Sequence, residues 1–105
     1  MSEADKLYDA ADQLRAAGKN DEAVAQYQEV LKLEPGYALA HSALAVVLTD
    51  LGRHDEAVRH ALRVCELEPN DTFSYTALSV TCMRAGKIPE AEDAMARARM
   101  LQQHR

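Results

Sequence analysis

The sequence repeats itself every 34 residues, and no insertion interrupts the period. Three glycines, three alanines and two prolines keep this step: Gly18, Gly52 and Gly86, Ala23, Ala57 and Ala91, and Pro35 and Pro69. Such a period is typical of repeat architectures, in which one unit cannot bury its apolar face alone. The chain is therefore predicted to be an array of stacked units that share one core.

Each unit is predicted to form two helices joined by a tight turn. In the first unit, the i, i+3, i+4, i+7 spacing of an amphipathic helix is found at Leu7, Ala10, Ala11 and Leu14. A second stripe follows at Ala23, Tyr27, Val30 and Leu33. Gly18 supplies the left-handed backbone between the helices, and Pro35 ends the second helix. Asn20 or Asp21 is expected to cap the start of that helix, and the later units repeat the layout, giving six helices.

Composition excludes several other classes of protein. Aromatic residues make up 5% of the 105 residues, too few for a typical sandwich or barrel. The formal net charge of −5 has the wrong sign for a general nucleic-acid binder. An acidic start and the absence of any long apolar run predict neither a secretory signal nor a membrane span, and hence a cytoplasmic location. Cys65 and Cys82 lack the spacing of a metal or redox motif and are expected to be reduced, partly buried thiols.

These features resemble the tetratricopeptide repeat family. The resemblance is carried in the middle unit by Leu44, Ala45, Leu48, Gly52, Asp55, Glu56, Ala57 and Pro69. It implies an all-α, right-handed α-solenoid of three helix-turn-helix hairpins in a single domain, residues 1–105, with repeats at 4–37, 38–71 and 72–105. It also implies a protein–protein interaction module without enzymatic activity.

The first helix of each unit has a second face, turned away from its core stripe. In the first unit this face is polar and includes Asp5, Tyr8 and Asp12. In the second and third units it is unexpectedly apolar, with Leu39, Ser42, Val46 and Thr49, and then Phe73, Thr76, Val80 and Met83. A hydrophobic surplus beyond the needs of the hairpin core indicates an interaction surface. The alternative interpretation is that adjacent first helices cover one another.

The family resemblance assigns these faces to the concave side of the superhelix, where peptides bind. Chaperone-binding members hold a peptide carboxylate with a clamp of Lys, Asn and Arg, but the matching positions here are Tyr8, Asp12, Ala43, Phe73 and Ala77. Acidic C-terminal tails are therefore disfavoured as ligands. The expected partner is a protein or peptide segment that is apolar with a basic flank, because the first unit contributes an acidic end to the groove.

The last helix suggests an alternative function, which is a self-associating scaffold. No further helix follows to cover Met95, Ala98, Met100 and Leu101. Residues 4–37 and 38–71 each have a net charge of −3, whereas residues 72–105 have +2, so the two ends are complementary. Head-to-tail homo-oligomers would follow. A cut from a longer protein, or a last helix that fits its own surface, would explain the same residues without association.

No pattern of residues indicates catalysis or a cofactor. His54 and His60 are six residues apart, which places them on different helix faces, and no metal-ligand set forms. His41 occupies a core position and is interpreted as a packed imidazole. The pairs Asp21–Glu22 and Asp55–Glu56 fall in first helical turns, where negative charge favours the helix dipole. The chain is therefore predicted to be no enzyme and to bind no metal or cofactor.

Overall fold

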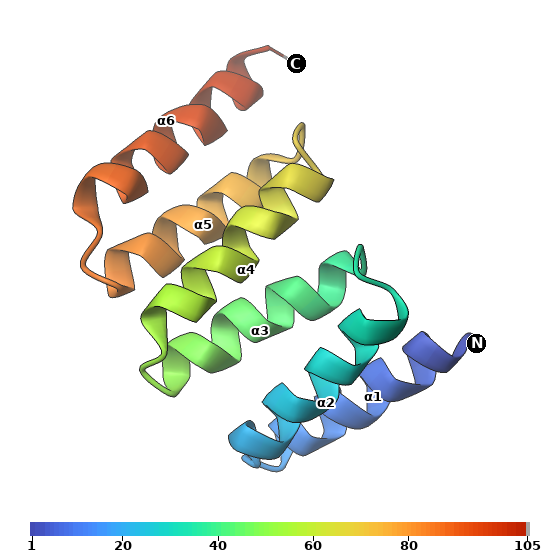
Figure 1. Cartoon of the computed structure of the whole chain (residues 1–105). Helices are drawn as coiled ribbons and strands as arrows, with labels where there is room; N and C mark the ends of the chain where they lie inside the picture. Colours follow the sequence, from blue (N-terminus) through green and yellow to red (C-terminus); the bar gives the residue numbers. More distant parts are fainter. Residues whose placement is uncertain (105) are drawn as a thin grey trace.

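The computed structural model describes residues 1–104, and within them it contains six α-helices and no strands. The helices are α1 (Glu3–Ala16), α2 (Asn20–Leu33), α3 (Ala38–Asp50), α4 (His54–Leu67), α5 (Thr72–Arg84) and α6 (Ile88–Gln103). They form three hairpins, α1–α2, α3–α4 and α5–α6, which stack in chain order (Figure 1). The predicted all-α helical repeat solenoid is confirmed.

The turn inside each hairpin depends on a glycine. Gly18, Gly52 and Gly86 have φ angles of 78°, 78° and 77°, a left-handed backbone that residues with a Cβ atom rarely adopt. The next residue then folds back on the first helix: the N–H of Arg53, for example, donates to the carbonyl of Leu48 at 2.8 Å. The repeated glycine therefore fixes the length of every first helix.

Helix starts differ from the prediction. α2 begins at Asn20 with Lys19 as its N-cap, and no side chain caps the helix. The predicted cap by Asn20 or Asp21 is therefore wrong, because Asn20 already lies inside the helix. Asp21 and Glu22 lie in the first turn of α2, as predicted, where their negative charge interacts favourably with the helix dipole. Side-chain caps occur instead at Ser2 for α1 and Asp71 for α5.

Small residues bring the two helices of each hairpin together. Ala23, Ala57 and Ala91 are all fully buried, at 0% exposure, between the helices of their own hairpins. A larger side chain there would force the helix ridges apart. Neighbouring hairpins stack through contacts of α2 with α3 and of α4 with α5, and the first helices α3 and α5 also touch.

Two further observations concern the whole described chain. Between residues 1 and 104, no helix is both long enough and apolar enough to cross a bilayer. Cys65 and Cys82 are free, as predicted, and they are buried rather than partly buried.

Candidate functional site

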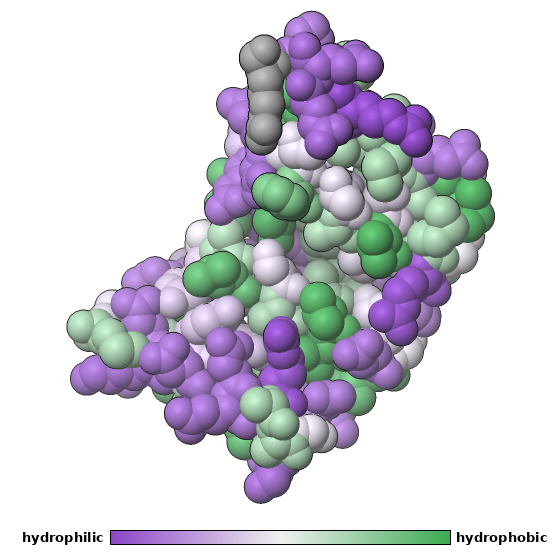
Figure 2. All heavy atoms as spheres, turned by 180° about the vertical axis from the view of Figure 1, so that it is seen from behind, coloured by the Kyte–Doolittle hydropathy of each residue, from purple (hydrophilic) through white to green (hydrophobic). Residues whose placement is uncertain are grey.

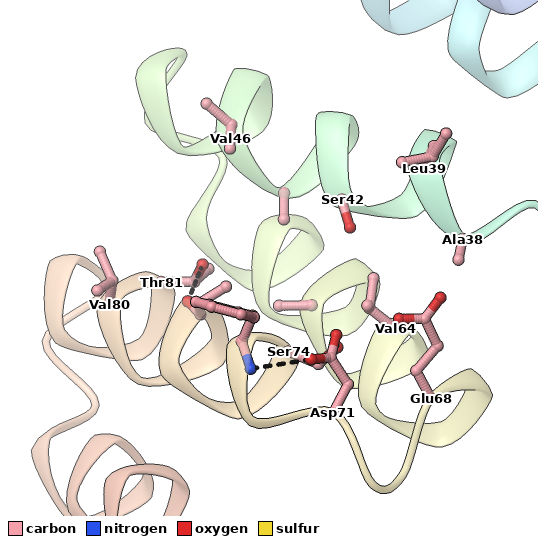
Figure 3. Close-up of a pocket in the computed structure, with 14 residues that line it drawn as sticks. Ala38, Leu39, Ser42, Val46, Val64, Glu68, Asp71, Ser74, Val80 and Thr81 are labelled. Atoms are coloured by element: carbon pink, nitrogen blue, oxygen red, sulfur yellow. Dashed lines mark hydrogen bonds between the residues drawn. The ribbon is translucent and has the colours of Figure 1, made fainter. Parts of the chain in front are cut away.

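A groove of about 500 Å³ lies between α3 and α5, with α4 beneath it. Its lining is mostly apolar and comes from three helices and the linker before α5: Ala38, Leu39, Ser42, Ala45, Val46, Ala61, Val64, Glu68, Asp71, Phe73, Ser74, Ala77, Val80 and Thr81. Figure 3 shows the α3 residues along one side of the groove and the α5 residues along the other, with Val64 on α4 and Glu68 just after it. We call this feature the α3–α5 groove.

Four large hydrophobic side chains border the groove and remain exposed. Leu39 and Val46 on α3 are 59% and 52% exposed, and Phe73 and Val80 on α5 are 78% and 54% exposed. The neighbouring first helices therefore do not cover them. The molecular face shown in Figure 2 has a hollow midway along its length, and hydrophobic side chains gather around that hollow. All four residues were predicted for this surface.

The floor of the groove was missed by sequence reasoning. It is made of small side chains, Ala45 on α3, Ala61 on α4 and Ala77 on α5, together with Val64. Because alanine fills little space between helices that packing holds apart, an open channel remains. Short residues at these positions of the middle and last units were the only available signal, and they also suit ordinary close packing.

The charged groups of the groove are both acidic and were also missed. Glu68 and Asp71 lie at one end, in the linker between α4 and α5. Asp71 caps α5, since its carboxylate accepts bonds from the Phe73 N–H at 3.1 Å and the Ser74 hydroxyl at 2.9 Å. Glu68 is exposed and forms no ion pair with another residue of the described chain. Its carboxylate is available to a ligand.

Among the predicted groove residues, two threonines are misplaced. Thr49 is 5% exposed, and its hydroxyl donates to the Ala45 carbonyl at 2.7 Å. Thr76 is half-buried and donates in the same way to the Thr72 carbonyl. Neither residue lines the groove, and each hydroxyl is bonded to a carbonyl of its own helix. Ser42 is exposed and does line it, as predicted.

The expected acidic end formed by α1 is a packed cluster rather than a free face. The Tyr37 and Tyr27 hydroxyls donate to the carboxylates of Asp5 and Asp12, each at 2.5 Å. Tyr8 lies beside both rings, with centroids 5.4 and 5.7 Å away. The bond to Asp5 raises the pKa of Tyr37 to about 12, and the same bond lowers the pKa of Asp5. Both carboxylates are therefore already partnered inside the chain.

The α6 surface predicted for self-association is only partly exposed. Met100 is 50% exposed, and Met95 and Leu101 are half-buried. Ala98 is 3% exposed, so its placement on an open surface is wrong: its small side chain is buried in the hairpin. Met83, predicted for the groove, instead lines a separate hollow beside α6, together with Met95.

The described residues do not assemble a metal-binding group. Nowhere in residues 1–104 do three His, Cys, Asp or Glu side chains meet in a suitable cluster. Burial raises the pKa of the Cys65 thiol to about 11, so the thiol is protonated at neutral pH and is a poor nucleophile. His41 is buried, in agreement with its interpretation as a packed imidazole.

Comparison with known proteins gives one family and several similar folds. A tetratricopeptide repeat family model matches residues 8–72, more than half of the chain. No curated protein sequence matches it. Among solved structures, MamA is similar with a TM-score of 0.87 and 20% identity over 96% of this chain. MamA from Desulfovibrio magneticus RS-1 is similar with a TM-score of 0.84 and 23% identity over 98% of it.

The share of each neighbour that is covered differs. This chain spans 59% of the first MamA chain and 58% of the second, less than two thirds of either. It spans 93% of the second tetratricopeptide domain of Spaghetti (RPAP3), which was solved bound to the HSP90 peptide SRMEEVD. In that comparison the TM-score is 0.83 and the identity 17% over 95% of this chain. At these identities the likeness shows a shared fold.

Proposed function

The chain belongs to the tetratricopeptide repeat family, and from that membership we propose that it is a non-enzymatic interaction module that binds a peptide or protein segment in the α3–α5 groove. The observation that carries the proposal is the exposure of Leu39, Phe73 and Val80 around a channel of about 500 Å³. Covering these side chains with a ligand would remove apolar surface from water, which stabilises a complex.

The ligand that fits this groove is apolar with a basic flank. The apolar part would lie over the alanine floor, between Val46 and Val80. The basic residue would meet Glu68, because Asp5 and Asp12, the carboxylates first expected to do so, are occupied by tyrosine hydroxyls. An acidic peptide such as SRMEEVD, bound by the Spaghetti domain, would instead face repulsion from Glu68.

Point variants test the groove. The probes are fluorescent peptides with a Leu-Phe centre and either Lys or Glu flanks, and binding is followed by anisotropy. Phe73→Ala and Val46→Asp should each weaken binding of the Lys-flanked peptide about tenfold or more, as expected for central interface residues. Leu33→Ala is the matched control, because Leu33 is 52% exposed on α2, outside the groove.

Circular dichroism of each variant should show unchanged helicity, since the substituted side chains are exposed. Equal binding of the Lys-flanked peptide by the wild type and both groove variants would refute the groove assignment. Tighter binding of the Glu-flanked peptide would refute the proposed ligand charge.

A self-associating scaffold is the second candidate function. The α6 surface offers Met95, Met100 and Leu101, and methionine is common on adaptable contact surfaces. Sedimentation over a range of concentrations distinguishes the two functions. A mass that rises with concentration and falls back to the monomer in Met100→Asp would support the scaffold, whereas a monomer throughout would exclude it.

A further inference from the structure

A second apolar hollow, of about 320 Å³, lies on another face of the chain, between α4 and α6 over α5. Its lining shares no residue with the α3–α5 groove: Val58, Leu62, Tyr75, Leu78, Cys82, Glu90, Asp93, Ala94 and Arg97. We call it the α4–α6 hollow. The internal repeat supplies a reference for it, since the positions 34 residues earlier lie on α2, α3 and α4.

One position of the hollow is much smaller than its counterpart in the preceding repeat. In the preceding pair of repeats, the place corresponding to Tyr75 and Ala94 is held by His41 and His60. Those two rings fill the space between their helices, with centroids 5.2 Å apart. In the α4–α6 hollow, the methyl group of Ala94 stands in place of the second ring, and a volume of about 320 Å³ remains open among the lining residues.

One residue in the wall of the hollow is also more apolar than its counterpart in the preceding repeat. Leu62 occupies the position of Gln28, and it is 47% exposed, although a leucine gains nothing from facing water. Val58 and Leu78 continue the apolar surface inward and are nearly buried. The α4–α6 hollow therefore has an apolar interior and one exposed aliphatic side chain, Leu62, at its edge.

The rim of the hollow carries unpaired negative charge. In the preceding repeat, Glu56 receives two hydrogen bonds from Arg53, at 2.9 and 2.8 Å. The equivalent Glu90 has no such partner, because Lys87 reaches across to Asp55 at 3.6 Å instead.

A second carboxylate joins Glu90 on this rim, since Asp93 stands where the preceding repeat has Arg59. Within the described residues neither Glu90 nor Asp93 forms an ion pair. Arg97, the one cation of the lining, lies over the Tyr75 ring, 5.8 Å from its centroid.

From the unfilled volume, the exposed leucine and the two unpaired carboxylates, we propose that the α4–α6 hollow is a second docking site, which takes an amphipathic helix of another protein. One large aliphatic side chain of that helix enters the space left by Ala94, and a Lys or Arg one turn away pairs with Glu90 and Asp93. A helix suits the site because the hollow runs between two helices, so that anchors three or four residues apart reach both the interior and the rim.

The test uses helical peptides as probes, with leucines at i and i+4 and a lysine at i+3 relative to the first leucine. Fluorescence anisotropy measures their affinity for the full chain. Leu62→Gln and Ala94→His restore the residues of the preceding repeat and should each weaken binding about tenfold, as the loss of a central anchor does. Ala96→His on the exposed side of α6 is the matched control and should bind normally.

Charge and location are tested separately. Glu90→Gln with Asp93→Asn should weaken the lysine peptide but not a peptide with glutamine in place of lysine. Phe73→Ala should leave binding of the helical peptides unchanged, because Phe73 does not line the α4–α6 hollow. The proposal for this hollow and the proposal for the α3–α5 groove can therefore be refuted independently. Leu62→Gln, on an exposed side chain, keeps the test valid if Ala94→His proves unstable.

Two outcomes would overturn the proposal. One is equal binding of the lysine peptide by the wild type, Leu62→Gln and Ala94→His. The other is loss of self-association, without any peptide, in those variants, which would identify the occupant as a second copy of this chain.

Discussion

At the scale of single residues, the contact that sequence reasoning missed most clearly is between His41 and His60. Their Nδ1 atoms are 2.9 Å apart, and the Nε2 atom of His41 is 2.8 Å from the Pro35 carbonyl oxygen. Since a carbonyl only accepts, the Nε2–H of His41 must donate to it, and its Nδ1 is left to accept from the Nδ1–H of His60. These two hydrogen bonds connect α3 to α4 and to the linker that precedes α3.

This geometry makes folding stability depend on pH. Burial and the neighbouring His41 lower the pKa of His60, and Arg59 acts in the same direction, whereas Glu56 raises it. The unfolded chain therefore binds more protons at this residue than the folded chain as the pH falls below the ordinary histidine pKa of about 6.5. The contribution of His60 is fully present above that pH and is lost as the pH falls through the folded-state pKa.

We expect the free energy of unfolding, measured with urea, to decrease from pH 8 to pH 5, a range in which histidine is the main titrating side chain. His60→Gln should flatten this decrease, because the shifted group is gone. His104→Gln, at the end of α6, is the matched control and should leave the slope unchanged. An identical slope in the wild type and His60→Gln would contradict the assignment.

At the scale of elements, the hairpins depend on alanines at which two helices touch. Ala57 is fully buried where α4 lies against α3. Ala57→Leu should lower the free energy of unfolding by about 1–3 kcal/mol, because the extra carbons must displace packed neighbours. Ala25→Leu, on the exposed face of α2, is the control and should have little effect. Thermal melts check both, and an unchanged midpoint for Ala57→Leu would contradict the close packing.

At the scale of the whole molecule, the net charge of −5 favours approach of a cationic ligand. Raising the salt concentration should weaken binding of the Lys-flanked peptide to the α3–α5 groove, because the Debye length falls from about 10 Å at 0.1 M to about 3 Å at 1 M. A neutral peptide with the same apolar centre is the control and should show little salt dependence. Affinity for the Lys-flanked peptide that is independent of salt would exclude a role for Glu68.

The sequence by itself determined the architecture, because the same 34-residue pattern of two helices and a turn occurs three times. The glycines fix the turns, and the buried alanines at 23, 57 and 91 fix the contact within each hairpin. It also identified the apolar face, since Leu39, Val46, Phe73 and Val80 interrupt a polar pattern that is visible in the first unit. These are local properties, set by residues close together in the chain.

Only the tertiary structure decided what each side chain meets. Asp5 and Asp12 were expected to be free, but tyrosines 32 and 15 residues further along the chain bond to them. Thr49 turns its hydroxyl onto its own helix, and Ala98 is buried by its own hairpin. Within residues 1–104, Glu68 and Glu90 form no ion pair, and Lys87 pairs with Asp55 instead. A repeat pattern specifies where a helix lies, whereas hydrogen bonds, ion pairs and empty volume depend on distances between side chains from different helices.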